Sequence, residues 1–237
     1  VRHLEPMGFI KFDLLGLSTL KMMEGCIEHI LRRHHEVENP TFADVLSYYN
    51  EHLHPDVIDM DNQEVYENIF HAGKWAGVFQ FTESGAQKFC VRAKPRNIID
   101  VSAITSIYRP GPLAANVHDE YVEAKESPHY IKYLNDDAHD ITQETFGFLI
   151  FQEQIALLAH KLGGLTLDEG NMLRKVLTKK GTGKGSVKGK LHDKFIKGCV
   201  AKNINRDDAQ SLWDKFEFFS GYGFNKSHAV SYSIISY

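Results

Sequence analysis

A chain of 237 residues can form one large domain or two small ones, and 43% hydrophobic with 24% charged residues is typical of a globular protein. Its net charge of −4 excludes the overall basic excess of many nucleic-acid-binding proteins, so any such site must be local. Its three widely spaced cysteines argue against a disulfide framework or a zinc site and favour a reducing compartment. Neither a membrane-spanning run nor a signal peptide is recognisable, so we expect a cytoplasmic protein without membrane contact.

The first predicted element is a half-buried strand over residues 9–14. Apolar Ile10 and Phe12 alternate there with charged Lys11 and Asp13. Residues two apart on a strand point the same way, about 6.5 Å apart, so the ammonium and the carboxylate would face one site. Such a pair suits a magnesium-bound polyphosphate, because the carboxylate can hold the cation while the lysine meets phosphate oxygens. Taken alone, a merely solvated polar face is the favoured interpretation.

The pattern is nearly all helical from there on, and no internal repeat occurs. We expect Ser18 to cap a first helix and Asp61 to cap another, which Gly73 ends. Further helices are predicted over residues 84–92 and 98–107. The run R-P-G-P at residues 109–112 fixes two φ angles, which predicts a rigid corner that ends the preceding helix.

The clearest helix signal lies in "TLDEGNMLRKVLTKK", where Thr166 and Glu169 form a capping box. Downstream, Arg174, Lys175 and Lys179 fall on the face opposite an apolar stripe. The sequence therefore predicts a helix from residue 167 to 179 with one basic face.

A local basic concentration spans residues 174–197, with nine lysines and arginines against one acid, Asp193. This is the pattern expected for a phosphate-bearing partner, and an equally weighted alternative is a solvated surface. The glycine-rich run at residues 179–190 is expected to be mobile, and its spacing does not fit a P-loop. The sequence contains no H-E-x-x-H metal motif and no G-x-S-x-G elbow.

Several blocks in fixed order carry a resemblance to a known family: "GFIKFDLLGLSTLKMM", "GVFQFTESGAQKF", "IYRPGPL", "FGFLIFQEQI", "LGGLTLDEGNMLRKVLTKK" and "FSGYGFNKSHAVSYSIISY". Together they resemble the bacterial replicative DNA polymerases of the C family, in particular the alpha-subunit branch. The Gram-positive-type replicative polymerases are a related alternative. The resemblance covers essentially the whole chain.

The resemblance implies a mainly α-helical fold with a short β palm segment, α+β overall. Residues 1–20 would form the C-terminal end of the palm, and residues 21–237 the helical fingers. The implied activity is that of a DNA-directed DNA polymerase, which adds deoxynucleoside triphosphates to a primer by two-metal phosphoryl transfer with Mg²⁺.

The same resemblance gives roles to individual residues. Asp13 is similar to the third metal-binding, catalytic aspartate, and Lys11 to a lysine on the nucleotide phosphates. Arg174 and Lys175 match a basic pair that holds the triphosphate, although the alpha subunit commonly has two arginines there, so the role of Lys175 is less secure. Tyr232 would pack near the nascent base pair. The remaining implied nucleotide-binding residues are Arg109, Asn225, Lys226, Ser227 and His228, and the implied nucleic-acid contacts are Lys179, Lys180 and Lys184.

Phosphoryl transfer by two metals needs several carboxylates, and in this family an Asp-x-Asp pair precedes the position of Asp13. The only D-x-D here is Asp59 to Asp61, which follows Asp13 and fits helix capping better. We therefore expect that this chain, whose ends look cut, does not polymerise alone. Implied partners are primer-template DNA and the rest of the polymerase, with a sliding clamp and a proofreading subunit bound through regions absent here. The alternative is a non-catalytic nucleotide- or nucleic-acid-binding module.

Overall fold

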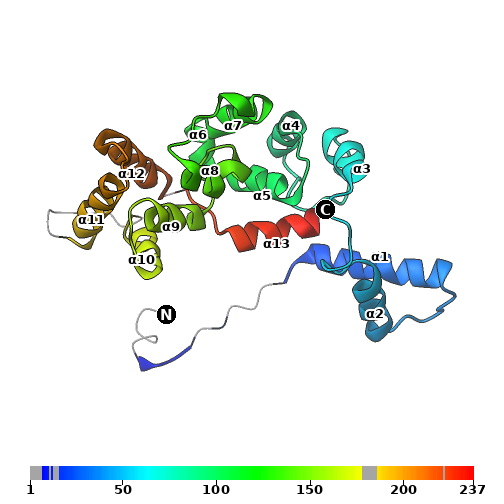
Figure 1. The fold of residues 1–237 in the computed structure, drawn as a ribbon. Coiled ribbons are helices and arrows are strands. Elements are labelled where there is room, and N and C mark those ends of the chain that lie inside the picture. Colours follow the sequence, from blue (N-terminus) through cyan, green and yellow to red (C-terminus); the bar gives the residue numbers. More distant parts are fainter. Residues whose placement is uncertain (1–6, 11, 13–15, 178–185, 221) are drawn as a thin grey trace. The chain divides into compact units, whose positions relative to one another are not determined.

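The structure is a computed structural model that describes residues 7–10, 12, 16–177, 186–220 and 222–237. Contacts divide the chain into two compact units, Val1–Asp59 and Met60–Tyr237. Within these described ranges the regular structure is helical, apart from an isolated parallel bridge between Phe151 and Phe224 (Figure 1). The predicted mainly α-helical fold is confirmed.

The predicted strand at residues 9–14 is not seen. Lys11 and Asp13 lie outside the described residues, while Phe9, Ile10 and Phe12 have no regular secondary structure. These three apolar side chains are 60%, 76% and 79% exposed, respectively, instead of half-buried. A strand needs a neighbouring strand to pair its backbone groups, and the described part of the chain offers none at this position.

The Val1–Asp59 unit is a pair of helices, α1 (Ser18–His34) and α2 (Phe42–His52). Ile27, Leu31 and Val45 form its small core. The helix predicted after Ser18 is present, but its N-cap is Leu17, one residue earlier, and no side chain caps it. The unit also has exposed apolar side chains on both helices.

The Met60–Tyr237 unit contains two hydrophobic cores. The first core includes Phe70, Tyr121 and Phe151, whereas the second includes Phe195, Trp213 and Phe216. The helices of this unit are α3 (Gln63–Val65), a π-helix (Tyr66–His71), α4 (Ser84–Ala93), α5 (Ile98–Ile107), α6 (Pro110–Ala114), α7 (Val117–Glu126), a 3₁₀ turn (Pro128–Tyr130), α8 (Asp136–Thr142), a second 3₁₀ turn (Gln143–Thr145), α9 (Gln152–Lys161), α10 (Leu167–Leu177), α11 (Val187–Ala201), α12 (Arg206–Ser220) and α13 (Lys226–Ser236).

Sequence-based predictions of these helices are confirmed for α4 and α5, and the R-P-G-P run ends α5 at Ile107 as expected. The cap predicted at Asp61 is wrong by one residue, because the Asn62 side chain accepts from the N–H of Glu64. α13 returns from the far end of the chain to pack along α5 (Figure 1), where the buried Ser102 and Ser233 hydroxyls are 3.0 Å apart.

A buried ion pair ties α5 to α7 beside the first core. Asp100 is 3% exposed, and its Oδ2 accepts from Lys125 Nζ at 2.5 Å and from the Arg96 N–H at 2.8 Å. Desolvation lowers the pKa of Lys125, and the Asp100 carboxylate partly offsets that shift. Burial likewise raises the pKa of the nearby Cys90 thiol to about 12.

Substituting Lys125→Met should destabilise the protein by about 3–5 kcal/mol, because it leaves the Asp100 carboxylate buried without its counter-ion. The double variant Asp100→Asn with Lys125→Met should recover much of the loss, since an amide oxygen can still accept from Arg96. Urea denaturation followed by tryptophan fluorescence measures both. A single Lys125→Met variant within 1 kcal/mol of the parent would contradict the role of the pair.

Candidate functional site

The starts of α9 and α13 are joined by a short parallel bridge. The Phe224 N–H donates to the Ile150 carbonyl at 3.0 Å, and the Gln152 N–H donates to the Phe224 carbonyl at 2.8 Å. These two bonds bring residues 222–226 against residues 150–153, although about seventy residues separate them in the chain. The side chains implicated by the sequence gather around this crossing.

Arg109 holds the chain just before the bridge. Its Nε donates to the Ser106 carbonyl at 2.8 Å, and its Nη2 donates to the Tyr222 carbonyl. The guanidinium carbon lies 4.6 Å from the ring centroid of Phe224, a cation–π contact. Desolvation lowers the pKa of this arginine. Arg109 therefore ties the R-P-G-P corner to residues 222–224.

Arg174 reaches the same crossing from the second core. Its helix, α10, starts with the predicted capping box: the Thr166 N–H donates to Glu169 Oε2 at 2.8 Å, and the Glu169 N–H donates to Thr166 Oγ1 at 3.2 Å. Gly170 allows α10 to approach α9, since a Cβ there would lie 2.9 Å from the Ala156 carbonyl oxygen. This close packing brings Arg174 to the start of α9.

The Arg174 guanidinium donates from Nη1 to the Gln152 side-chain oxygen, and Gln152 Nε2 donates to the Gly223 carbonyl at 2.8 Å. Arg109 and Arg174 are thus connected to adjacent carbonyls, those of Tyr222 and Gly223. The Arg174 Nε is buried and has no hydrogen-bond partner among the described residues. A buried donor of this kind is costly, which favours a site completed by an acceptor.

The first turn of α13 is fixed by two glutamates. Glu153 accepts from Asn225 Nδ2 at 2.9 Å and from the Lys226 N–H at 3.0 Å. Lys226 Nζ donates to both carboxylate oxygens of Glu144, at 2.6 and 2.8 Å. Lys226 therefore has a counter-ion within the fold. Asn225 is also the N-cap of α13, accepting from the His228 N–H at 2.8 Å.

Aromatic rings follow one face of α13. The ring centroids of His228 and Tyr232 are 4.0 Å apart, and those of Phe224 and His228 are 5.4 Å apart. Phe79 extends the series at 5.3 Å from Tyr232. His228 and Tyr232 lie at i and i+4, so both rings are presented on the same helix face. Ser227, next to this face, donates to the Asn225 side chain at 2.7 Å.

The structure thus brings together Arg109, Arg174, Asn225, Lys226 and His228. Ser227 and Tyr232 adjoin them on α13, while Lys175 is exposed on α10. The sequence analysis missed Gln152, Glu153 and Glu144, which hold the cluster in place. Lys11 and Asp13, like Lys179, Lys180 and Lys184, lie outside the described residues.

The basic run at residues 174–197 is partly neutralised by the fold. Lys188 pairs with Glu217 at 2.9 Å, and Lys194 pairs with Glu169 at 2.7 Å. The positive charge at the surface of α11 is therefore smaller than the count of basic residues in the sequence suggests.

The part of the chain that the structure describes contains no group of three or more His, Cys, Asp or Glu side chains able to hold a metal ion. None of its helices is long and apolar enough to cross a membrane.

A family model for the bacterial DNA polymerase III alpha subunit finger domain matches residues 19–203, more than half of the chain. This chain therefore belongs to that finger-domain family. Relatives along almost the whole chain are named DNA polymerase III subunit alpha. They include proteins of Campylobacter jejuni (32% identical over 235 residues), Aquifex aeolicus (31% over 235 residues) and Rickettsia conorii (34% over 242 residues).

These alignments cover 99%, 99% and 100% of this chain, respectively, but only 18%, 19% and 18% of the relatives. The chain thus spans less than a fifth of the length of these curated relatives. The family resemblance read from the sequence is confirmed.

Gly111 in the R-P-G-P corner tests the contact that anchors residues 222–224. A Cβ at this position would lie 2.2 Å from the Tyr222 ring, so Gly111→Ala must displace that side chain. We expect a loss of about 1–3 kcal/mol in the free energy of unfolding, measured by urea denaturation.

A double-mutant cycle supplies the control. A Tyr222→Ala background removes the ring atoms that the added methyl group would meet, and Gly111→Ala should there cost much less than in the parent. Equal costs in the two backgrounds would show that Tyr222 is not the obstacle.

Proposed function

We propose that the chain forms the fingers of a C-family replicative DNA polymerase and binds the triphosphate of the incoming deoxynucleotide. The single observation that carries this proposal is the convergence of Arg109 and Arg174, from two different cores, on residues 222–224. Guanidinium groups match phosphate oxygens in geometry and charge. The unpartnered Arg174 Nε supports the proposal, because a phosphate oxygen can accept a hydrogen bond from its N–H.

Other residues take supporting roles in this proposal. Lys175 adds positive charge on the exposed side of α10, and Ser227 lies beside the capped turn at Asn225. His228 and Tyr232 present ring faces near the base, since aromatic faces stack on any base. Lys226 acts mainly through Glu144, which fixes the first turn of α13.

The catalytic part of the proposal concerns residues 1–20, assigned to the end of the palm, with residues 21–237 as the fingers. Asp13 supplies one carboxylate ligand to the catalytic Mg²⁺ and Lys11 contacts the phosphates, as in two-metal phosphoryl transfer. The other carboxylate ligands in this proposal are the Asp-x-Asp pair that precedes the position of Asp13 in the C-family polymerases. Primer-template DNA, contacted by Lys179, Lys180 and Lys184, is the second substrate of this cytoplasmic enzyme.

The rival function is a nucleotide- or nucleic-acid-binding module without catalysis. Both functions would use Arg109 and Arg174 to bind phosphate, but only the polymerase function gives Asp13 a catalytic role. Two experiments therefore test the proposal, one for triphosphate binding and one for catalysis.

Triphosphate binding is measured by titrating the 237-residue chain with a fluorescent deoxynucleoside triphosphate and Mg²⁺. Arg174→Ala should weaken binding at least about tenfold, because it removes a charge-assisted hydrogen bond. Arg174→Lys keeps the positive charge but loses the planar guanidinium, so its affinity for the triphosphate should lie between those of the parent and Arg174→Ala. Arg206→Ala, at an exposed arginine that begins α12, is the matched control and should bind like the parent. Unchanged binding by a folded Arg174→Ala chain contradicts the proposed site.

Catalysis is tested by mixing the chain with a palm-and-thumb partner that carries the other two aspartates and measuring primer extension. Activity should appear with the parent chain and fall by at least about a hundredfold with Asp13→Ala, because the metal loses a ligand. Activity that survives Asp13→Ala overturns the catalytic assignment. Triphosphate binding without extension by any such partner favours the binding module.

A further inference from the structure

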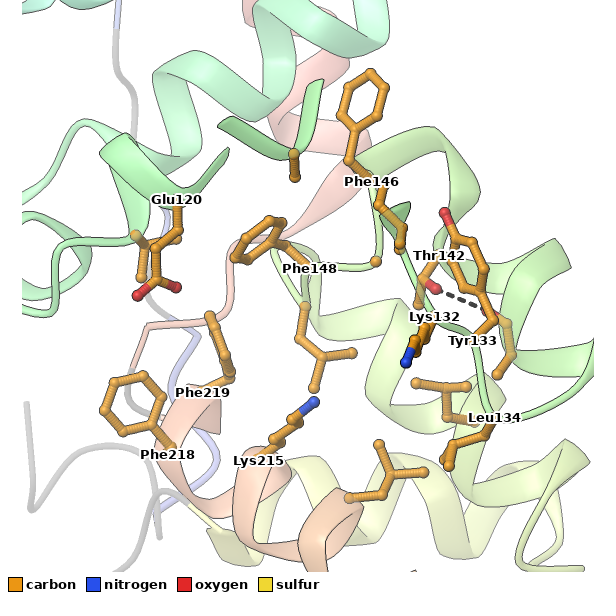
Figure 2. Close-up of a pocket in the computed structure, with 18 of the residues that line it drawn as sticks. Glu120, Lys132, Tyr133, Leu134, Thr142, Phe146, Phe148, Lys215, Phe218 and Phe219 are labelled. Carbon is orange, nitrogen blue, oxygen red and sulfur yellow. Dashed lines mark hydrogen bonds between the residues drawn. The ribbon is translucent and has the colours of Figure 1, made fainter. Parts of the chain in front are cut away.

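The Met60–Tyr237 unit contains a cavity of about 540 Å³. Neither Arg109 nor Arg174 lines this cavity. Its walls come from α7, α8, α9 and α12 and from residues 131–134 and 146–149 (Figure 2). This volume is in the range of small-molecule sites, about 300–1,000 Å³. Most of the lining is apolar, with Ile131, Leu134, Phe148, Leu149, Leu212 and Phe219 among its residues.

Two lysines give the cavity a positive side. Lys132 and Lys215 come from separate segments, and Figure 2 shows both ammonium groups pointing into the cavity. Within the described chain neither lysine forms an ion pair, although other lysines of this unit do, such as Lys188 and Lys194. The acidic lining residue, Glu120, lies across the cavity from Lys132 (Figure 2). Two lysines therefore offer positive charge to a cavity with mostly apolar walls.

Aromatic side chains define the shape of the apolar part. Phe148 and Phe219 face the interior, and Tyr133 lines the wall next to Lys132 (Figure 2). Burial raises the pKa of the Tyr133 phenol, which is consistent with a wall of reduced polarity. Flat rings of this kind pack well against an aromatic or long aliphatic body.

We propose that this cavity binds a small amphipathic anion. Its aromatic or aliphatic body fills the apolar part, and its single carboxylate or sulfonate lies between Lys132 and Lys215. A triphosphate does not fit this chemistry, because most of its oxygens would need hydrogen-bond donors that the apolar walls lack. The proposal is thus independent of the proposed function.

The test uses the 237-residue chain and anilinonaphthalene sulfonate, an aromatic anion whose fluorescence rises in an apolar environment. Decanoate and decanol then compete for the site, since they share the aliphatic body and differ in charge. We expect saturable binding of the probe and displacement by decanoate at least about tenfold better than by decanol, the effect of a charge-assisted hydrogen bond.

Variants locate the binding. Lys132→Met combined with Lys215→Met should weaken the probe and decanoate at least about tenfold and leave decanol unchanged. Lys88→Met, at an exposed lysine of α4 outside the cavity, is the matched control. Ala124→Phe, at a lining position of α7, should fill the cavity and reduce binding of all three ligands, while circular dichroism verifies the fold.

Each other outcome overturns the proposal. Equal competition by decanol and decanoate would mean that the cavity binds apolar groups, such as a side chain of another protein segment, without selectivity for an anion. Probe binding that is unchanged in the double lysine variant and in folded Ala124→Phe places the site elsewhere, for example in the apolar groove between α1 and α2.

Discussion

The two hydrogen bonds between Phe224 and residues 150–152 are the constraint on which the arrangement of the larger unit depends. They fasten the start of α13 to the start of α9, and the body of α13 then packs along α5. Phe151 lies in the first core, whereas Ile155, one helical turn later, lies in the second. The bridge is therefore where the two cores meet, and Arg109 and Arg174 reach it from opposite cores.

The sequence predicted what depends on near neighbours. The capping box of α10 and the start and end of α5 are encoded within a few residues, so they could be read directly. The strand at residues 9–14 could not be judged in the same way, because its pairing requires a neighbour distant in sequence. The error at Asp61 arises because the adjacent Asn62 caps the helix instead, whereas α1 begins after Leu17 without any side-chain cap, so a capping residue could not mark its start.

The residues of the candidate site also fall into those that the sequence could identify and those that it could not. Arg109 and Arg174 were identifiable from a turn motif and a basic helix face, and the family resemblance named the first residues of α13. Gln152, Glu153 and Glu144 were not identifiable, since their partners lie 71 to 82 residues away in the chain. Charge counting also overestimated the basic surface, because Lys188 and Lys194 have acidic partners on α12 and α10. Such pairings are properties of the fold and leave no local pattern.

The meeting of two cores at one bridge has a mechanical consequence. Rotation of the second core against the first would strain the backbone links at residues 150–152 and 222–224, where Gly223 is packed against Gln152. A ligand that binds Arg109 and Arg174 together would restrain movement at these links. By thermodynamic reciprocity, an interaction that holds these links in the ligand-bound arrangement would also raise the affinity for such a ligand.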